Sequence, residues 1–169
     1  MRIFQSFNRS YLPLAHIFEL GIQLGVLANG ARVGFGSPRT LTDTNVKPVG
    51  DLNAVKPTFL IAVPRVYDTI RKGAMEKVNS SLITKFLFET AFEARKNAIK
   101  HGRDTPLWNF LIFKNFLSNL GGLCQKCVSG GAPLAPDTQE FIRIAFGIPI
   151  VQGYGLTETC AGFFNLLLS

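Results

Sequence analysis

Cysteine and histidine are scarce in this chain, with three and two residues among 169. Three cysteines are too few for the disulfide framework of a small secreted domain. Cys124 and Cys127 form a Cys-x-x-Cys pair, but zinc would need two further ligands, and Cys160, His16 and His101 lack ligand spacing. A thioredoxin-like pair would open a helix, whereas these two lie in an expected strand on opposite or offset sides. We therefore interpret both as buried small apolar residues.

The chain also lacks a long uninterrupted apolar run. A membrane-spanning helix needs about 18 or more consecutive apolar residues, and Glu19, Lys85, Glu89 and Lys114 interrupt the best candidates. Polar residues within the first nine positions likewise exclude the apolar centre of a secretory signal. We therefore expect a cytosol-facing protein.

Acidic residues are outnumbered, and the formal net charge is +7. The segment 65–126 holds most of the excess, with 11 Lys or Arg and 5 Asp or Glu. Such a face could meet anionic lipid or the phosphates of coenzyme A, or it could be a solvated helical face that keeps an apolar protein dispersed. No helix-turn-helix, zinc-finger, RRM or KH pattern accompanies the charge, so we expect no specific nucleic-acid binding.

Apolar residues, in contrast, are abundant. They make up 47% of the chain and include 15 phenylalanines, more than one core of this size requires. We therefore expect some apolar surface to stay uncovered, and poor solubility of the isolated chain.

Strand and helix patterns alternate along the sequence. The expected strands are 31–35, 58–63, 123–129 and 149–151, and the expected helices are 17 to near 30, 65–78, 81–100, 107–120 and 136–146. Residues 41–46 suggest a short helix or turn. This alternation predicts an α/β fold with a parallel sheet flanked by helices.

Two loops of small residues stand one βαβ spacing apart, after the strands 123–129 and 149–151. A right-handed crossover makes those strands parallel, so both loops leave the sheet at its carboxyl edge, where ligands bind in open α/β sheets. Four glycines of the loops allow close approach of backbone to a ligand: Gly130, Gly131, Gly153 and Gly155.

The second loop also carries polar and aromatic chemistry. Tyr154 offers a stacking face, Thr157 a hydroxyl and Glu158 a carboxylate that suits Mg²⁺ beside phosphate. Either loop alone is typical of an ordinary turn, cap or solvated surface. Together they predict half of a nucleotide pocket.

Four ordered segments resemble the acyl-adenylate-forming synthetases, and among them the long-chain fatty acyl-CoA synthetases. They are 11–19 (YLPLAHIFE), 56–67 (KPTFLIAVPRVY), 130–133 (GGAP) and 152–159 (QGYGLTET). The basic, Phe-rich stretch 77–119 is similar to an insertion of the long-chain subgroup. Residues 10–162 carry the resemblance, whereas 1–9 and 163–169 match poorly, so we expect 1–169 to be one incomplete AMP-dependent synthetase/ligase domain.

The resemblance implies roles for individual residues. The nucleotide-binding residues would be Gly130, Gly131, Ala132, Pro133, Gln152, Gly153, Tyr154, Gly155 and Thr157, with Thr157 on phosphate. Glu158 would bind Mg²⁺, and His16, Thr157 and Glu158 would be catalytic, with His16 beside the acyl carboxylate. From the residues alone, a cap on the helix that it opens is the favoured role of His16, and the resemblance reverses that balance.

The implied reaction joins a fatty acid to coenzyme A with ATP and Mg²⁺, giving acyl-CoA, AMP and pyrophosphate. The family's phosphate-grasping loop, Thr-Gly-Asp loop and C-terminal lysine are not found in the sequence, so we expect this fragment of the large domain to be inactive alone. The alternatives are a non-catalytic acyl- or nucleotide-binding module and a basic peripheral-membrane module. The resemblance allows contact with endoplasmic reticulum, peroxisome or lipid droplet membranes.

Overall fold

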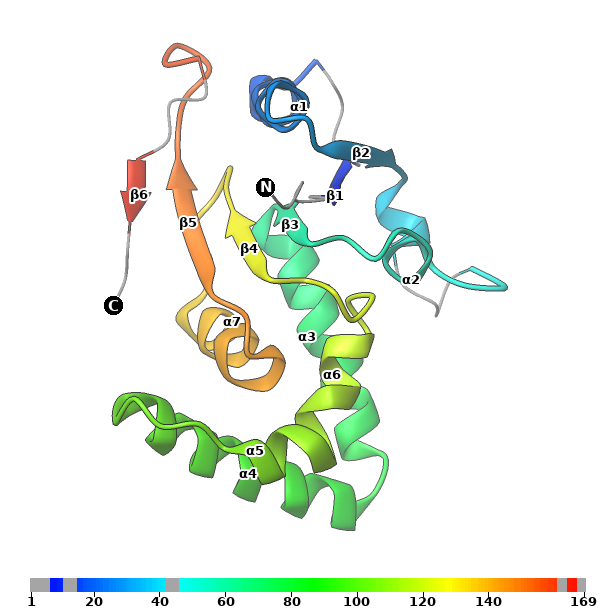
Figure 1. Ribbon diagram of the computed structural model, residues 1–169, viewed down its shortest axis with the longest axis vertical. Helices are drawn as coiled ribbons and strands as arrows, with labels where there is room; N and C mark the ends of the chain where they lie inside the picture. The colour runs from blue at the N-terminus through cyan, green and yellow to red at the C-terminus, as the bar shows by residue number, and fades with distance from the viewer. Residues whose placement is uncertain (1–6, 11–14, 42–45, 161–163, 167–169) are drawn as a thin grey trace.

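The computed structural model describes residues 7–10, 15–41, 46–160 and 164–166, whose strands form one six-stranded sheet (Figure 1). The strand order is β2-β1-β3-β4-β5-β6, and only the β5–β6 pair is antiparallel. The strands are β1 (Phe7–Ser10), β2 (Arg32–Phe35), β3 (Phe59–Ala62), β4 (Lys126–Ser129), β5 (Ile150–Tyr154) and β6 (Phe164–Leu166). The predicted α/β fold with a parallel sheet is confirmed.

Helices connect the parallel strands. They are α1 (Ile17–Ala28), η1 (Pro38–Thr40), α2 (Asp51–Val55), α3 (Pro64–Asn79), α4 (Leu82–Lys100), α5 (Pro106–Trp108), η2 (Asn109–Phe113), α6 (Lys114–Ser118), α7 (Pro136–Phe141) and η3 (Ile142–Phe146). The five long helices expected from the sequence are confirmed, although η2 and η3 are wider π-helical turns within them. Of the turn expected at 41–46, residues 42–45 lie outside the described residues.

Four elements were not predicted: strands β1 and β6, helix α2 and the short helix η1. Strand β5 also continues to Tyr154, beyond the expected 149–151, because it is hydrogen-bonded to β6 along its second half, where Tyr154 pairs with Phe164. Residues 152–154 are therefore strand, and the second loop begins at Gly155.

Helix α3 packs against the sheet through one apolar face. Val66, Ile70, Ala74 and Val78 recur every third or fourth position and are buried, as expected for one stripe of an amphipathic helix. Pro64 occupies the first helical turn, where its missing N–H costs nothing. Helices α3 and α7–η3 contact one another, and α4 contacts both of them farther from the sheet.

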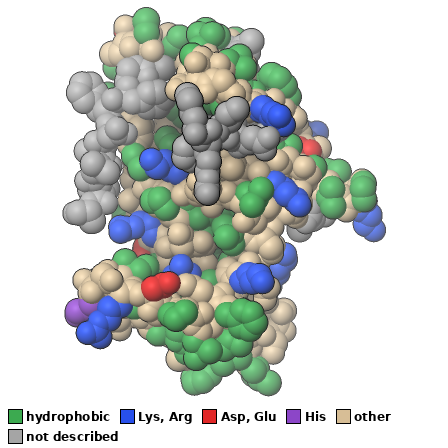
Figure 2. Space-filling view, viewed as in Figure 1, with side chains coloured by type: hydrophobic (Ala, Val, Ile, Leu, Met, Phe, Trp, Pro, Cys, Tyr) green, Lys and Arg blue, Asp and Glu red, His purple; other side chains and the backbone are tan. Residues whose placement is uncertain are grey.

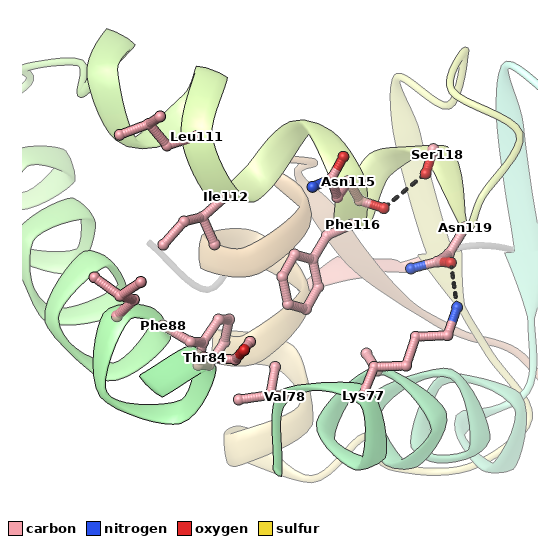
Figure 3. A pocket seen from close by; sticks show the side chains of 12 residues that line it. Lys77, Val78, Thr84, Phe88, Leu111, Ile112, Asn115, Phe116, Ser118 and Asn119 are labelled. Atoms are coloured by element: carbon pink, nitrogen blue, oxygen red, sulfur yellow. Dashed lines mark hydrogen bonds between the residues drawn. The ribbon is translucent and has the colours of Figure 1, made fainter. Parts of the chain in front are cut away.

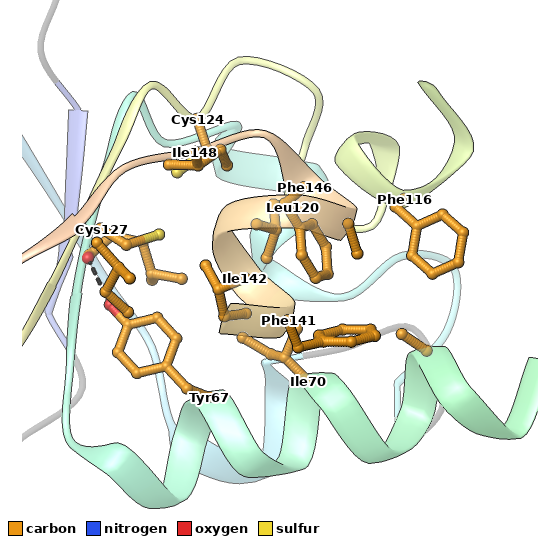
Figure 4. Packing of buried hydrophobic residues seen from close by; sticks show 14 of the residues in the cluster. Tyr67, Ile70, Phe116, Leu120, Cys124, Cys127, Phe141, Ile142, Phe146 and Ile148 are labelled. Carbon is orange, nitrogen blue, oxygen red and sulfur yellow. Dashed lines mark hydrogen bonds between the residues drawn. The ribbon is translucent and has the colours of Figure 1, made fainter. Parts of the chain in front are cut away.

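Phenylalanine fills the space between these helix layers. The ring of Phe88 lies 5.1 Å from that of Phe116, 5.6 Å from Phe92, 6.2 Å from Phe141 and 6.5 Å from Phe113, measured between centroids. Figure 4 shows Phe116, Phe141 and Phe146 side by side in this core. Much of the unusual phenylalanine content therefore joins the outer helices to the sheet layer.

Tyr67 of α3 links two strands of the sheet from the helix side (Figure 4). Its fully buried hydroxyl lies 2.8 Å from the carbonyl oxygen of Leu60 in β3 and 2.9 Å from that of Val128 in β4. One hydroxyl proton is thus shared between two acceptors on neighbouring strands.

The two paired cysteines are buried, as the sequence interpretation requires, with exposed fractions of 4% and 0%. Strand β4 begins only at Lys126, so Cys124 precedes it, and the Cys124 thiol donates to the carbonyl oxygen of Lys126 at 3.7 Å. The expectation that both cysteines lie in the strand is therefore wrong for Cys124. The neighbouring Cys124 thiol, and then burial, raises the pKa of the Cys127 thiol well above its usual value, while the neighbouring Cys127 thiol lowers the pKa of Cys124.

Apolar side chains remain exposed at the end of the molecule formed by α4, α5 and η2 (Figure 2). We call Leu82, Ile83, Phe86, Leu107 and Phe110 the apolar tip; their exposed fractions run from 65% to 87%. They form part of the uncovered apolar surface that the composition predicts. Within the described residues, no helix combines the length and apolar character needed to cross a bilayer.

Candidate functional site

The carboxyl ends of β4 and β5 meet at one edge of the sheet, as predicted. The two strands are adjacent and parallel, and Ser129 at the end of β4 pairs with Gln152 of β5. Loop 130–135 and loop 155–160 therefore start from neighbouring strands on the same edge, which we call the rim (Figure 1). The two strands that carry the predicted loops are therefore neighbours and parallel, as the sequence predicts.

The first loop is held against helix α1. The Gly130 N–H donates to the carbonyl of Ala62 at 3.3 Å, and a Cβ on Gly130 would lie 2.6 Å from the ring of Phe18. Glycine is thus needed at position 130 to make room for the Phe18 ring. The sequence had predicted that the absence of a side chain there would make room for a ligand. Gly131 has φ +83°, a conformation that side chains rarely adopt, and it is exposed together with Ala132 and Pro133.

A chain of side-chain amides ties this loop to strand β5 and helix α7. The backbone N–H of Leu134 donates to Oε1 of Gln152 at 3.2 Å, and Nε2 of Gln152 donates to Oε1 of Gln139 at 2.8 Å. The amide of Gln152 is therefore engaged within the chain. The sequence analysis did not identify Gln139. Its place one turn before Ile142 indicates the buried face of the helix, but its partner Gln152 lies on another element.

His16 caps helix α1, the role that the residues alone favour. Its Nδ1 accepts from the backbone N–H of Phe18 at 3.2 Å, and its ring meets that of Phe18 edge-on at 6.5 Å. Because Nδ1 is the acceptor, a neutral His16 carries its proton on Nε2. Phe18 also contacts Gly130, so the exposed imidazole stands beside the rim. Residues 11–14 of the same motif lie outside the described residues.

The second loop presents its functional groups to solvent. Tyr154 ends β5 with 57% of its surface exposed. A compact turn follows, in which Thr159 Oγ1 accepts from the Leu156 N–H at 2.9 Å and the Cys160 N–H donates to the Thr157 carbonyl at 3.2 Å. The side chains of Thr157 and Glu158 are exposed on this turn.

The donor chemistry of the rim suits a hard cation beside a phosphate. Glu158 and Thr157 supply oxygen atoms, the ligands that Mg²⁺ prefers. Among the described residues, no group of three His, Cys, Asp or Glu side chains could hold a metal by itself. Mg²⁺ commonly takes one or two carboxylates and completes its shell with substrate phosphate and water, so this donor set fits it.

A separate cavity of about 460 Å³ lies between α3, α4, η2 and α6 (Figure 3). Its lining includes Val78, Leu87, Phe88 and Leu111, while Lys77 Nζ donates to Asn119 Oδ1 at 3.0 Å at its edge. None of the predicted site residues lines this cavity. This cavity among the helices is therefore separate from the rim.

Comparison with known proteins identifies relatives along nearly the whole chain. The AMP-binding enzyme family matches residues 7–168. Long chain acyl-CoA synthetase 8 of Arabidopsis thaliana is 45% identical over 164 residues, covering 90% of this chain and 23% of that protein. Long-chain-fatty-acid–CoA ligase 2 of Schizosaccharomyces pombe is 41% identical over 162 residues, covering 93% and 23%. The chain therefore spans less than a quarter of the length of these curated relatives.

Solved structures share the fold. The A domain of carboxylic acid reductase from Segniliparus rugosus, in complex with AMP and a co-purified carboxylic acid, aligns with a TM-score of 0.60 at 21% identity, covering 89% of this chain and 20% of that one. The N-terminal domain of FACL13 from Mycobacterium tuberculosis aligns with a TM-score of 0.56 at 18% identity, covering 97% and 30%. At these identities the likeness concerns the fold.

Proposed function

The chain belongs to the AMP-binding enzyme family, and from that membership we propose that it forms the nucleotide-facing part of a long-chain fatty acid–CoA ligase. The proposed reaction of the whole protein consumes ATP, a fatty acid and coenzyme A and yields acyl-CoA, AMP and pyrophosphate. The observation that carries the proposal is the pairing of Ser129 with Gln152, which brings both small-residue loops to one rim. The long-chain acyl-CoA synthetases among the relatives support the fatty acid as substrate.

Each rim residue has a role that its chemistry allows. The exposed backbone of 131–133 borders the adenine, Tyr154 stacks on it, and the Thr157 hydroxyl donates to a phosphate. His16, whose Nε2 is left free by the cap, donates to the acyl carboxylate. Glu158 holds Mg²⁺, which offsets charge on the phosphates when bound. The acyl carboxylate attacks the α-phosphate of ATP and displaces pyrophosphate, and the coenzyme A thiol then takes the acyl group and releases AMP.

This proposal predicts AMP binding that depends on Tyr154. Base–aromatic stacking is worth about 1–3 kcal/mol, so Tyr154→Ala should weaken AMP affinity by about tenfold or more, measured by calorimetric titration of the chain. Phe110→Ala, which truncates another exposed ring on η2, should leave the affinity unchanged. Absence of saturable binding by the wild-type chain, or equal affinity of the Tyr154→Ala variant, contradicts the nucleotide site.

The apolar tip favours a second function, contact with a membrane surface on the cytosolic side, as at peroxisome, endoplasmic reticulum or lipid droplet. Its exposed rings are accompanied by basic side chains: Lys85 lies between Ile83 and Phe86 on α4, and Lys114 Nζ stands 5.9 Å above the ring of Phe110. Apolar side chains with flanking lysines suit the interface of an anionic bilayer. A relative from Arabidopsis thaliana is named as peroxisomal.

Membrane contact predicts binding to vesicles through the apolar tip. Burying one phenylalanine is worth about 1.5–3 kcal/mol, so Phe86→Ser/Phe110→Ser should reduce sedimentation with phosphatidylserine-containing vesicles by more than about tenfold. Phe35→Ser, on the distant strand β2 with 73% exposure, serves as the matched control. Reversing the charges of Lys96, Lys100 and Arg103 should weaken binding further. Sedimentation unchanged by both sets of substitutions would remove this function.

A further inference from the structure

The orientation of the Gln152 and Gln139 side-chain amides is determined by the backbone N–H of Leu134. A backbone N–H only donates, so Leu134 requires the Oε1 atom of Gln152, and that choice leaves Nε2 to face α7. Nε2 only donates, so it requires the Oε1 atom of Gln139. The donor at Leu134 thus fixes both amides in one arrangement.

The pair is enclosed and attached to a firm support. Gln139 is 9% exposed, Leu134 is 5% exposed and Gln152 is half-buried, so both bonds of the pair are partly shielded from water. Helix α7 is itself fastened to α3, because the buried Thr138 hydroxyl donates to Asp68 at 2.7 Å. Gln139 therefore transmits the position of the helix layer to the loop above it.

The loop has a second anchor at its other end. Gly130 is held by the Ala62 carbonyl and by the Phe18 ring. Between this anchor and Leu134 lie only residues 131–133, which are exposed at the rim. The place of those three residues is therefore determined by Gly130 at one end and by the two amides at the other.

We propose that Gln139 and Gln152 act as a strut that holds loop 130–134 in its ligand-binding conformation, which makes Gln139 a positioning residue for the nucleotide. This inference rests on the proposed nucleotide site but assigns Gln139 no contact with the ligand. It also gives Gln152 an indirect role, through Leu134.

Hydrogen exchange tests the strut without any ligand. Gln139→Leu removes the acceptor for Gln152 Nε2 while keeping similar volume, so exchange of the Leu134 amide, followed by NMR, should accelerate by about tenfold, the value of one typical hydrogen bond. Gln139→Glu keeps an acceptor and should keep the protection. Gln125→Leu makes the same chemical change at an exposed position and serves as the control. Unchanged Leu134 exchange in the Gln139→Leu variant overturns the strut.

Nucleotide affinity tests the positioning role. Gln139→Leu should weaken AMP binding by about three- to tenfold, while Gln139→Glu restores it. In Gln139→Glu/Gln152→Glu two carboxylates face each other, so binding should be weak at neutral pH and recover near pH 5, where one shared proton restores a donor and an acceptor. Equal affinity of wild type and Gln139→Leu, with faster Leu134 exchange, overturns the positioning role. If the wild-type chain binds no AMP, the positioning role falls with the proposed nucleotide site, and the exchange result still decides the strut.

Discussion

Phe88→Ala is expected to lower the free energy of unfolding by about 3–5 kcal/mol, the usual cost of truncating a buried aromatic side chain. The ring is 5% exposed and meets four other phenylalanine rings. Its removal leaves a cavity where α4 joins the helix layer on the sheet, and it also loses the aromatic contacts themselves. Denaturant titration followed by circular dichroism measures the loss.

Phe86 provides the matched control, because it stands on the same helix with 69% of its surface exposed. Phe86→Ala should change the free energy of unfolding by no more than about 0.5 kcal/mol. Similar losses in the two variants would contradict the assignment of Phe88 to the core and of Phe86 to the apolar tip.

Gly121→Ala is expected to have the second large effect. Its φ is +81°, and a Cβ at this position would lie 2.5 Å from the carbonyl oxygen of Leu52 and 2.7 Å from the Cα of Lys56. Both obstacles are backbone atoms, so relief requires a shift of the α2 region. We expect a loss of about 2–4 kcal/mol in the free energy of unfolding, combining backbone strain with overpacking.

The neighbouring Gly122 separates the two contributions. It has φ +78°, but a Cβ there meets nothing within 4 Å. Gly122→Ala should therefore lose only the conformational term, about 1–2 kcal/mol. The difference between the two variants measures the contact between Gly121 and α2, and equal losses would mean that this contact is absent in solution.

The alternation of patterns was enough to predict the parallel part of the sheet and its helices. Buried strands such as 59–62 and amphipathic helices such as α3 can be predicted from the periodicity of apolar residues. In such elements, the burial of each residue follows from its position in the repeat. Strands β1 and β6 depend instead on pairing with distant segments. They have only four and three residues, which is too short for an alternating pattern to be recognised, so they were not predicted. The π-helical turns η2 and η3 keep the same apolar periodicity as an α-helix, so periodicity cannot distinguish them.

The position of the rim at the edge of the sheet could be predicted from the sequence, whereas most of the contacts between its residues could not. The βαβ spacing brought loops 130–135 and 155–160 to one edge, which topology alone requires. The contact between Gly130 and Phe18 joins segments more than a hundred residues apart, so no local rule could assign Gly130 to packing. Gln139 was overlooked for a similar reason, since its partner is reached only after the chain has returned through β5.

The shared hydroxyl proton of Tyr67 has a consequence for how the molecule opens. Separating β3 from β4 breaks a hydrogen bond to the Tyr67 side chain of α3. Moving α3 away removes the Tyr67 hydroxyl from the carbonyls of both Leu60 and Val128. We therefore expect β3, β4 and α3 to unfold together as one cooperative unit. The rim at the carboxyl ends of these strands is therefore carried by a unit that does not unfold in separate parts.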